Sequence, residues 1–255
     1  LVDYRSSFNY DDYFDADGVK RAQAGYYGLC SFLDENVGKI LSALEDAGLA
    51  DDTHVIYTSD HGDNLGARGL WGKSTMFEES AGVPLIIAGS GIPAGKTIDT
   101  PVSHVDVYPT VMQAITGTPD SLPGFPGHSL LSIATGTVPD RNVLVEYHGM
   151  GSTTGAFMIR HEQYKYIHYV GYPAQLFDLE QDPEELRDLA ALPAYAFVLD
   201  TCRQRLRAIC DPETVDRQAK MRQRALLEEN GGREAVIARG DLGFSPVPGA
   251  AIVFD

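Results

Sequence analysis

The clearest hydrophobic pattern in the chain lies between about Arg21 and Ala47, where apolar residues recur at spacings of three and four. This spacing places them along one side of a helix, so the sequence predicts one long amphipathic helix. Gly48 stands where a helix commonly ends on a residue with a left-handed backbone. The apolar positions are Tyr26, Leu29, Cys30, Leu33, Val37, Ile40, Leu41 and Leu44.

Two short apolar runs, HVIYTSD at 54–60 and VPLIIAG at 83–89, predict buried strands because β-branched and aromatic residues favour them. A loop with four glycines at 62–74 lies between them, and MFEESAG at 76–82 predicts a short helix. A further helix is predicted in SHVDVYPTVMQAITG at 103–117. This alternation of helix and strand predicts an α/β layer with a mostly parallel sheet.

The start of this last helix contains three residues of interest. Asp106 is a candidate cap, and Pro109 is compatible with a helix only in its first turn. His104 precedes the helix and is interpreted as a structural residue.

The C-terminal half predicts a small sheet followed by helices. Three runs with strand composition are joined by short polar turns, which favours antiparallel pairing. They are NVLVEYH (142–148), GAFMIRH (155–161) and QYKYIHYV (163–170). Residues 175–190 predict a strand, a turn and the start of a helix. Residues 193–229 predict two helices broken near CDPET (210–214), and the tail from 230 is expected to be irregular.

Composition narrows the class of protein. The hydrophobic and charged fractions, 44% and 22%, are those of a globular protein. The formal charge of −16 disfavours nucleic acid and anionic membranes as partners, and residues 200–255 are charge-balanced. No CxxC pair is present, which predicts reduced thiols and a cytoplasmic protein, with a periplasmic location left open. The chain begins with Leu1 rather than Met, so an upstream segment is expected.

The strongest chemical signal is the block from residue 58 to 86. Asp60 and His61 follow directly after a predicted strand, where ligands bind in α/β sheets, and both residue types bind metal ions. Asp63 and Asn64 add oxygen atoms nearby. Lys73 could stabilise negative charge on a transferring group, whereas Arg68 is a weak candidate for holding the loop by an ion pair. Taken singly, such residues more often cap or end a strand.

The block DHGDNLGARGLWGK resembles the sulfatase family of the alkaline phosphatase superfamily, most closely its choline-sulfatase-like and phosphonate monoester hydrolase-like members. The resemblance implies that Asp60 and His61 are metal ligands and that Lys73 is catalytic, contacting the sulfate or phosphate oxygens. It also makes Glu146 and His148 candidates for contacting a cationic part of the substrate, although a polar pair at a strand end is at least as good an interpretation.

The same resemblance implies parts that this chain does not contain. The family nucleophile is a cysteine or serine in a C-x-P-x-R-type motif, converted to formylglycine, and it is expected in a missing N-terminal half together with the first aspartate ligands. Cys30 and Cys202 stand in no such motif, and Cys210 in CDPET is followed by Thr214 where arginine is required. The implied cofactor is a divalent ion, calcium, manganese or magnesium, with His61 favouring a transition ion.

The implied fold is α/β: part of an alkaline-phosphatase-like mixed sheet flanked by helices, with a small antiparallel C-terminal sheet and a helical extension. The expected boundaries are 1–118 for part of the core, 119–192 for the small sheet and 193–255 for the extension. By its position this extension resembles a segment that joins subunits in choline-sulfatase-like relatives, so a homo-oligomer is expected.

The function that follows is a metal-dependent sulfuric ester hydrolase acting on a small sulfate ester. As this chain alone it is expected to be incomplete and inactive. One alternative is a phosphonate or phosphate ester hydrolase of the same superfamily, which shares the metal pair. The other is a non-catalytic fragment that acts in assembly.

Overall fold

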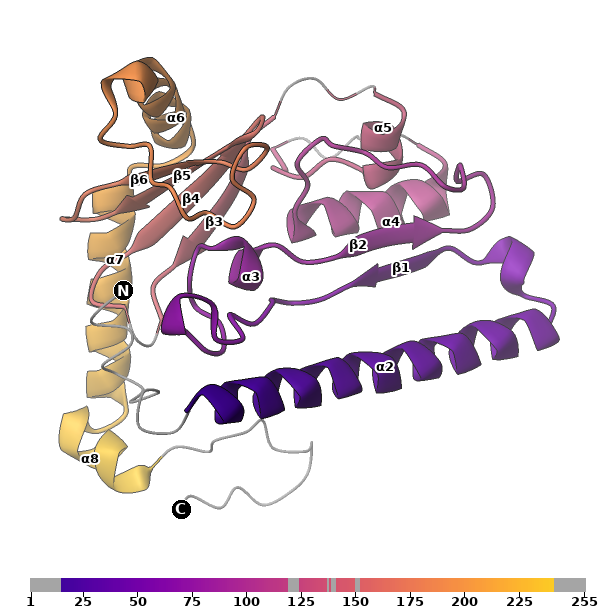
Figure 1. Ribbon diagram of the computed structural model, residues 1–255, viewed down its shortest axis with the longest axis horizontal. Helices are drawn as coiled ribbons and strands as arrows, with labels where there is room; N and C mark the ends of the chain where they lie inside the picture. The colour runs from indigo at the N-terminus through magenta and orange to yellow at the C-terminus, as the bar shows by residue number, and fades with distance from the viewer. Residues whose placement is uncertain (1–14, 119–123, 137, 139–140, 150–151, 241–255) are drawn as a thin grey trace.

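A computed structural model describes the protein over residues 15–118, 124–136, 138, 141–149 and 152–240 (Figure 1). Its described strands form two antiparallel sheets. The strands are β1 (Val55–Thr58), β2 (Leu85–Ala88), β3 (Val143–Tyr147), β4 (Ala156–His161), β5 (Tyr164–Tyr169) and β6 (Gln175–Asp178). The helices are α2 (Ala16–Asp46), α3 (Glu78–Ala81), α4 (Val107–Thr116), α5 (Leu130–Ala134), α6 (Ala196–Ile209), α7 (Pro212–Glu229) and α8 (Gly232–Arg239). Short 3-10 turns are η2 (Ala50–Asp52), η3 (Ala67–Gly69), η4 (His104–Asp106) and η5 (Pro193–Tyr195).

The predicted long helix is confirmed as α2, which begins a few residues earlier than expected. Asp15 caps it by accepting a hydrogen bond from the Gly18 amide, and Gly48 has the expected left-handed backbone, with φ of 69°. The apolar face of α2 is uncovered within the described part of the chain, since Leu29 is 67% and Ile40 is 68% exposed. None of the described helices is long and apolar enough to cross a membrane.

The expectation of a mostly parallel sheet is wrong for the described strands. β1 and β2 pair antiparallel, with Val55 opposite Ala88, and in Figure 1 the pair runs between α2 and α4. The connection at 59–84 contains only the glycine-rich loop and the single turn of α3, and it returns the chain beside β1 in the opposite direction. β2 is also only half-buried, because Ile86 is 58% exposed.

Asp106 occupies the N-cap position of α4, but its side chain caps the preceding turn η4 instead, in a capping box with Ser103. It is fully buried and accepts hydrogen bonds from the Ser103 and His128 amides, and its two oxygens each lie 2.9 Å from a nitrogen of the Arg141 guanidinium. It therefore ties the start of α4 to the segments before α5 and β3. Pro109 lies in the first turn of α4, as predicted.

The predicted small antiparallel sheet is confirmed, with the strand order β3-β4-β5-β6. The helix expected after β6 is absent from the described residues. Instead the chain turns back along β6: the Leu189 amide donates to the Leu176 carbonyl, and Asp188 accepts from the Leu176 amide. These two bonds use the free edge of β6, which is why the segment after it stays extended and turned.

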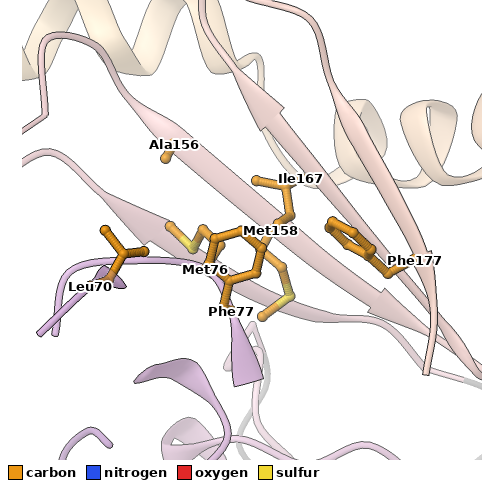
Figure 2. Close-up of a cluster of buried hydrophobic side chains, with 7 residues drawn as sticks. All are labelled: Leu70, Met76, Phe77, Ala156, Met158, Ile167 and Phe177. Carbon is orange, nitrogen blue, oxygen red and sulfur yellow. The ribbon is translucent and has the colours of Figure 1, made fainter. Parts of the chain in front are cut away.

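The two faces of the four-stranded sheet are both buried, by different parts of the chain. One face packs on the loop before α3 through a cluster of apolar side chains, shown in Figure 2. Its members are Leu70, Met76, Phe77, Ala156, Met158, Ile167 and Phe177. The other face packs on α6, where Cys202 and Leu206 are buried against Phe157 and Ile159. The sheet therefore joins the loop of the candidate site to the C-terminal helices.

The two predicted C-terminal helices are confirmed as α6 and α7. They break where expected, with Cys210 ending α6 and Pro212 starting α7, a position in which a proline costs the helix no hydrogen bond. α8 was not predicted, because the glycines and prolines after residue 230 suggested an irregular tail. The end of that tail, 241–255, and the predicted extended segment at 1–14 lie outside the described residues.

Candidate functional site

The turn after β1 fixes the directions of Asp60 and His61. Gly62 follows them and donates its N–H to the Ser80 carbonyl at 2.9 Å. A Cβ at Gly62 would lie 2.0 Å from the Glu79 carbonyl oxygen, so no larger residue fits where the chain crosses α3. The sequence requires glycine here because two backbones touch, and the crossing places the end of β1 beside α3.

Asp63 and Asn64 close the glycine-rich loop by hydrogen bonds to its own backbone. Asp63 Oδ1 accepts from the Leu65 and Gly72 amides. Asn64 is buried, and both its amide N–H and its side-chain Nδ2 donate to the Gly72 carbonyl, at 2.6 and 2.8 Å. Thr75 donates to Asn64 Oδ1 at 3.1 Å. Asp63 Oδ1 and Asn64 Oδ1 are therefore engaged in returning the chain to the end of β1.

This closure brings Lys73 to His61. The Nζ atom of Lys73 lies 2.7 Å from Nε2 of His61, and the Asp60 carboxylate lies 3.3 Å from the same nitrogen. Because the other ring nitrogen, Nδ1, lies 2.8 Å from the Gly62 carbonyl, which can only accept, the proton sits on Nδ1. Nε2 therefore presents its lone pair toward the Lys73 ammonium.

The same neighbours set the charge of Asp60. Its pKa lies below the ordinary value: partial burial raises the pKa, but the nearby His61 and Lys73 and the His61 amide together lower it by more. The Asp60 side chain is 83% exposed, so this carboxylate is ionised and accessible to a ligand.

Arg68 holds the loop from its far side. Its guanidinium donates to both oxygens of Glu79 at 2.8 Å and lies 4.0 Å from the centre of the Phe77 ring. It also donates to the Glu184 carbonyl, in the segment after β6. Arg68 thus holds the loop by ion pairing, the role in which it was a weak candidate.

A pocket of about 620 Å³ opens where the loop, α3, η4 and the four-stranded sheet meet. Of the five residues predicted for the site, Asp60, His61, Lys73 and Glu146 line it, and His148 does not. Polar residues that line it and that were not predicted include Glu78, Asp99, Ser103, His104, Tyr147 and Arg160.

The strand alternation separates Glu146 from the centre of the pocket. Glu146 is opposite Phe157, whose side chain belongs to the cluster under α6. Burial raises the pKa of the Cys210 thiol, and the negative charge of Glu146 raises it further. The side chain of Glu146 therefore lies at the pocket rim on the α6 side. His148 packs edge-on against Phe157 with 5.3 Å between ring centres, and its carbonyl accepts from Gln223 of α7.

His104 was interpreted as structural, yet the structure places it in the pocket. Its Nε2 lies 3.4 Å from the Thr58 hydroxyl, at the end of β1 and close in sequence to Asp60. Arg160 is also half-buried in the pocket wall, and burial lowers the pKa of its guanidinium. Alternation along β4 could have found Arg160, because Met158 shares its face, but only once the layer covering that face was known.

No cluster of three or more histidine, cysteine, aspartate or glutamate side chains suited to a metal ion occurs among the described residues. The Asp60–His61 pair supplies two candidate ligand side chains. The arrangement can therefore hold one part of a metal site, beside an ammonium group, at the open edge of a pocket.

Comparison with known families decides the class of protein. Residues 3–118 match the Sulfatase family, and residues 66–211 match the C-terminal region of N-sulphoglucosamine sulphohydrolase. The second match covers more than half of the chain. The chain belongs to the sulfatase family.

Individual sulfatases show how much of the enzyme this chain spans. It is 42% identical over 178 residues to choline-sulfatase of Rhizobium meliloti, covering 69% of this chain and 35% of that protein. It is 36% identical over 227 residues to arylsulfatase K of Danio rerio, covering 85% of this chain and 43% of that protein. The chain therefore spans less than half the length of these curated relatives.

The fold agrees with the family. The structure of the phosphonate monoester hydrolase of Agrobacterium radiobacter superposes with a TM-score of 0.64 at 29% identity, covering 76% of this chain and 42% of that one. The predicted α/β class and the predicted alkaline-phosphatase-like sulfatase family are thus confirmed.

Proposed function

We propose that this chain forms part of the active site of a metal-dependent hydrolase of sulfate esters. The observation that carries the proposal is the convergence of Asp60, His61 and Lys73 on one pocket, with 2.7 Å between the lysine and histidine nitrogens. A carboxylate, an imidazole lone pair and an ammonium group together suit a divalent cation and an anionic ester.

Asp60 and His61 are the residues that would hold the metal ion. Their donor set fits, because Asp60 is ionised and the Nε2 lone pair of His61 is not used by the backbone. An octahedral site needs about six ligands, so the remainder come from other parts of the protein, substrate or water. Calcium, manganese and magnesium all suit such a site. A bound divalent ion supplies Lewis-acid stabilisation of the ester oxygens.

Lys73 is the residue that we assign to the sulfate group. In the structure its ammonium donates to the Nε2 lone pair of His61. When that lone pair is used by a metal ion, the ammonium can donate to sulfate oxygens instead. There it stabilises the negative charge that develops on the leaving oxygen during hydrolysis. The formylglycine nucleophile is expected in the part of the family fold that this chain does not span.

The structure alters which residues are candidates for contacting the substrate. Glu146 stays a candidate for contacting a cationic group from the pocket rim. His148 has no support as a substrate contact, because it packs against Phe157 and does not line the pocket. His104 and Arg160 are better placed to contact a small sulfate ester.

A phosphonate or phosphate ester hydrolase is the second candidate function. It is favoured by the superposition with a phosphonate monoester hydrolase, and the residues assigned above suit either anion. The two activities differ in the ester bond that is cleaved. Relative rates on an aryl sulfate and an aryl phosphonate therefore decide between them.

The first experiment measures both rates for the native protein that contains this chain. Lys73→Ala is expected to lower kcat for the preferred ester by roughly 100- to 1000-fold, the cost of losing one preorganised donor. Lys96→Ala is the matched control, because Lys96 is an exposed lysine outside this pocket. Hydrolysis of neither ester, or an unchanged kcat in Lys73→Ala, would overturn the proposal.

A second experiment tests the metal. Protein treated with EDTA should lose ester hydrolysis and regain it with calcium, manganese or magnesium. Asp60→Asn and His61→Gln should weaken Mn²⁺ binding in calorimetry, whereas Asp63→Asn should not, because Asp63 is used in closing the loop. Equal Mn²⁺ affinity in Asp60→Asn and the unmodified protein would contradict the assignment.

We also propose that the C-terminal helices join subunits. Met221 of α7 and Ile237 of α8 are 63% and 64% exposed and offer large apolar side chains for a contact between subunits. Deleting the whole extension would uncover the sheet, because Leu206 of α6 is buried in its core. The test is therefore Met221→Glu with Ile237→Glu, which should lower the mass measured by light scattering; an unchanged mass would contradict it.

A further inference from the structure

A fully buried lysine lies beneath the candidate site. Lys165 of β5 has no exposed surface, and its ammonium is surrounded by three oxygen atoms. It donates to the Met76 carbonyl at 3.0 Å and forms ion pairs with Glu78 at 2.6 Å and Glu185 at 2.8 Å. Lys165, Glu78 and Glu185 are called the Lys165 cluster below.

The partners of Lys165 come from outside its own sheet. Met76 and Glu78 belong to the segment that follows Lys73, and Glu185 belongs to the segment after β6. Glu185 also accepts from the Glu78 amide at 2.6 Å, so this carboxylate contacts both the lysine and the start of α3. Three parts of the chain that are distant in sequence are thus connected at one buried point.

Such a cluster is costly for folding alone. Removing an ammonium and a carboxylate from water is repaid only by good pairing, and apolar residues of similar size often serve stability as well or better. Much of the same face of the sheet is apolar, as Figure 2 shows for Met158, Ile167 and Phe177, although Arg160 of β4 lies opposite Lys165. Burial accordingly raises the pKa of Glu185, and Lys165 offsets this only in part.

The backbone of Glu185 also indicates that the Lys165 cluster does more than fill the core. Its φ is 53°, in the left-handed region that residues with a side chain seldom adopt. A strained residue of this kind persists where its surroundings hold it, and here the contacts of its carboxylate with Lys165 and the Glu78 amide do so. The cluster therefore has directional bonds that an apolar contact would lack.

We infer that the Lys165 cluster is a positioning device that sets the Lys73 segment at a fixed place against the four-stranded sheet. The inference rests on the proposed function, since it assigns the cluster to the segment that carries the sulfate-binding lysine. Only two residues separate Lys73 from Met76, whose carbonyl Lys165 holds. An apolar contact lets the segment slide, whereas bonds to Met76, Glu78 and Glu185 fix its register.

The test is a double-mutant cycle in the native protein. Lys165→Met combined with Glu185→Gln removes both fully buried charges, and only the partly exposed Glu78 carboxylate loses its lysine partner. We expect kcat/KM to fall by roughly 10- to 100-fold, as for a displaced catalytic group. In a Lys73→Ala background the same pair of substitutions should lower kcat/KM by less than about twofold, because the coupled residue is already gone. Equal losses in both backgrounds would overturn the inference.

Hydrogen exchange measures the positioning without reference to activity. The amides of residues 74–78 should exchange at least about tenfold faster in Lys165→Met/Glu185→Gln, because the segment opens locally more often. Lys220→Met is the matched control: it also removes a lysine paired with one carboxylate at 2.8 Å, but on α7. Unchanged exchange at 74–78 overturns the inference. If the native protein hydrolyses no ester, the proposed function fails, and this measurement still decides the positioning role.

A third variant guards against loss of folding. Glu78 is 43% exposed, so Glu78→Gln removes one charged contact without leaving a buried carboxylate unpaired. It should also speed exchange at residues 74–78, to a smaller extent, because Glu185 still holds Lys165. No change in Glu78→Gln, when the double variant is unfolded, would overturn the positioning role.

Discussion

Lys73 Nζ lies 2.7 Å from His61 Nε2, although eleven residues of loop separate the two side chains. The loop brings the two side chains together because Asn64 donates two hydrogen bonds to the Gly72 carbonyl at the base of the loop. The lone pair of His61 that faces the lysine is the one that a metal ion would use. The two residues that we propose to bind the metal ion and the sulfate group are thus held as neighbours.

The first prediction concerns Asn64, which is 1% exposed. Asn64→Ala removes the side-chain bonds to the Gly72 carbonyl and from the Thr75 hydroxyl, so the Lys73 end of the loop should shift away from His61. We expect kcat/KM for the ester to fall by about 10- to 100-fold. Asn230→Ala on the exposed end of α7 is the control. Wild-type kinetics in Asn64→Ala would show that the loop closes by other means.

The second prediction concerns the crossing at Gly62. Gly62→Ala places a methyl group 2.0 Å from the Glu79 carbonyl oxygen, so the backbone of α3 must move. The free energy of unfolding in urea should fall by about 1–3 kcal/mol. Gly28→Ala in α2 is the matched substitution: it meets no atom within 4 Å and should stabilise the helix by ~0.5–1 kcal/mol. Equal effects would contradict the crossing geometry.

The third prediction concerns Asp106 and Arg141, whose side chains are 0% and 8% exposed. Asp106→Asn leaves the guanidinium buried without a carboxylate, and breaking a buried pair in this way costs about 3–5 kcal/mol of the free energy of unfolding. Urea denaturation measures the loss. Asp99→Asn changes an exposed carboxylate and should cost less than about 0.5 kcal/mol. A loss below about 0.5 kcal/mol in Asp106→Asn as well would show that water reaches the Asp106–Arg141 pair.

Local patterns in the sequence predicted the elements well where one segment decides the outcome. The spacing of apolar residues gave α2, and alternation with short turns gave the hairpins of β3, β4 and β5. The direction of β2 relative to β1 depends on the path of residues 62–82 in space, which spacing does not encode. The missing helix after β6 has a similar cause, because bonds between Leu189 and Leu176 lie outside any local pattern.

The candidate site was predictable only as a block. The motif found Asp60, His61 and Lys73, and folding placed all three on one pocket. Glu146 and His148 were chosen because the family resemblance implies that they lie near the substrate, but which face of their strand looks into the pocket depends on the loop packed against it. Lys165 could not be found, because a lysine within a strand of aromatic residues looks like a solvent-facing position until its partners, Glu78 and Glu185, are in place.

The last prediction concerns pH and His168, which joins β5 to α7 through a 3.3 Å contact with Glu213. Burial lowers the pKa of His168 below its ordinary value of 6.5; Glu213 opposes this and Arg207 adds to it. Below pH 6.5 His168 therefore binds a proton more readily in the unfolded chain than in the folded chain. The free energy of unfolding is accordingly highest above pH 6.5 with respect to this group and decreases as the pH falls.

Urea denaturation from pH 7.5 to 5 measures this dependence. Carboxylates also titrate toward the lower end of that range. The informative quantity is therefore the difference in pH dependence between His168→Gln and the control His54→Gln. His168→Gln should show a smaller fall in the free energy of unfolding with falling pH than the unmodified protein. His54→Gln, at an exposed position, leaves His168 in place and should keep the original slope. If the free energy of unfolding changed with pH by the same slope in His168→Gln and His54→Gln, protonation of His168 would not contribute to the pH dependence of stability.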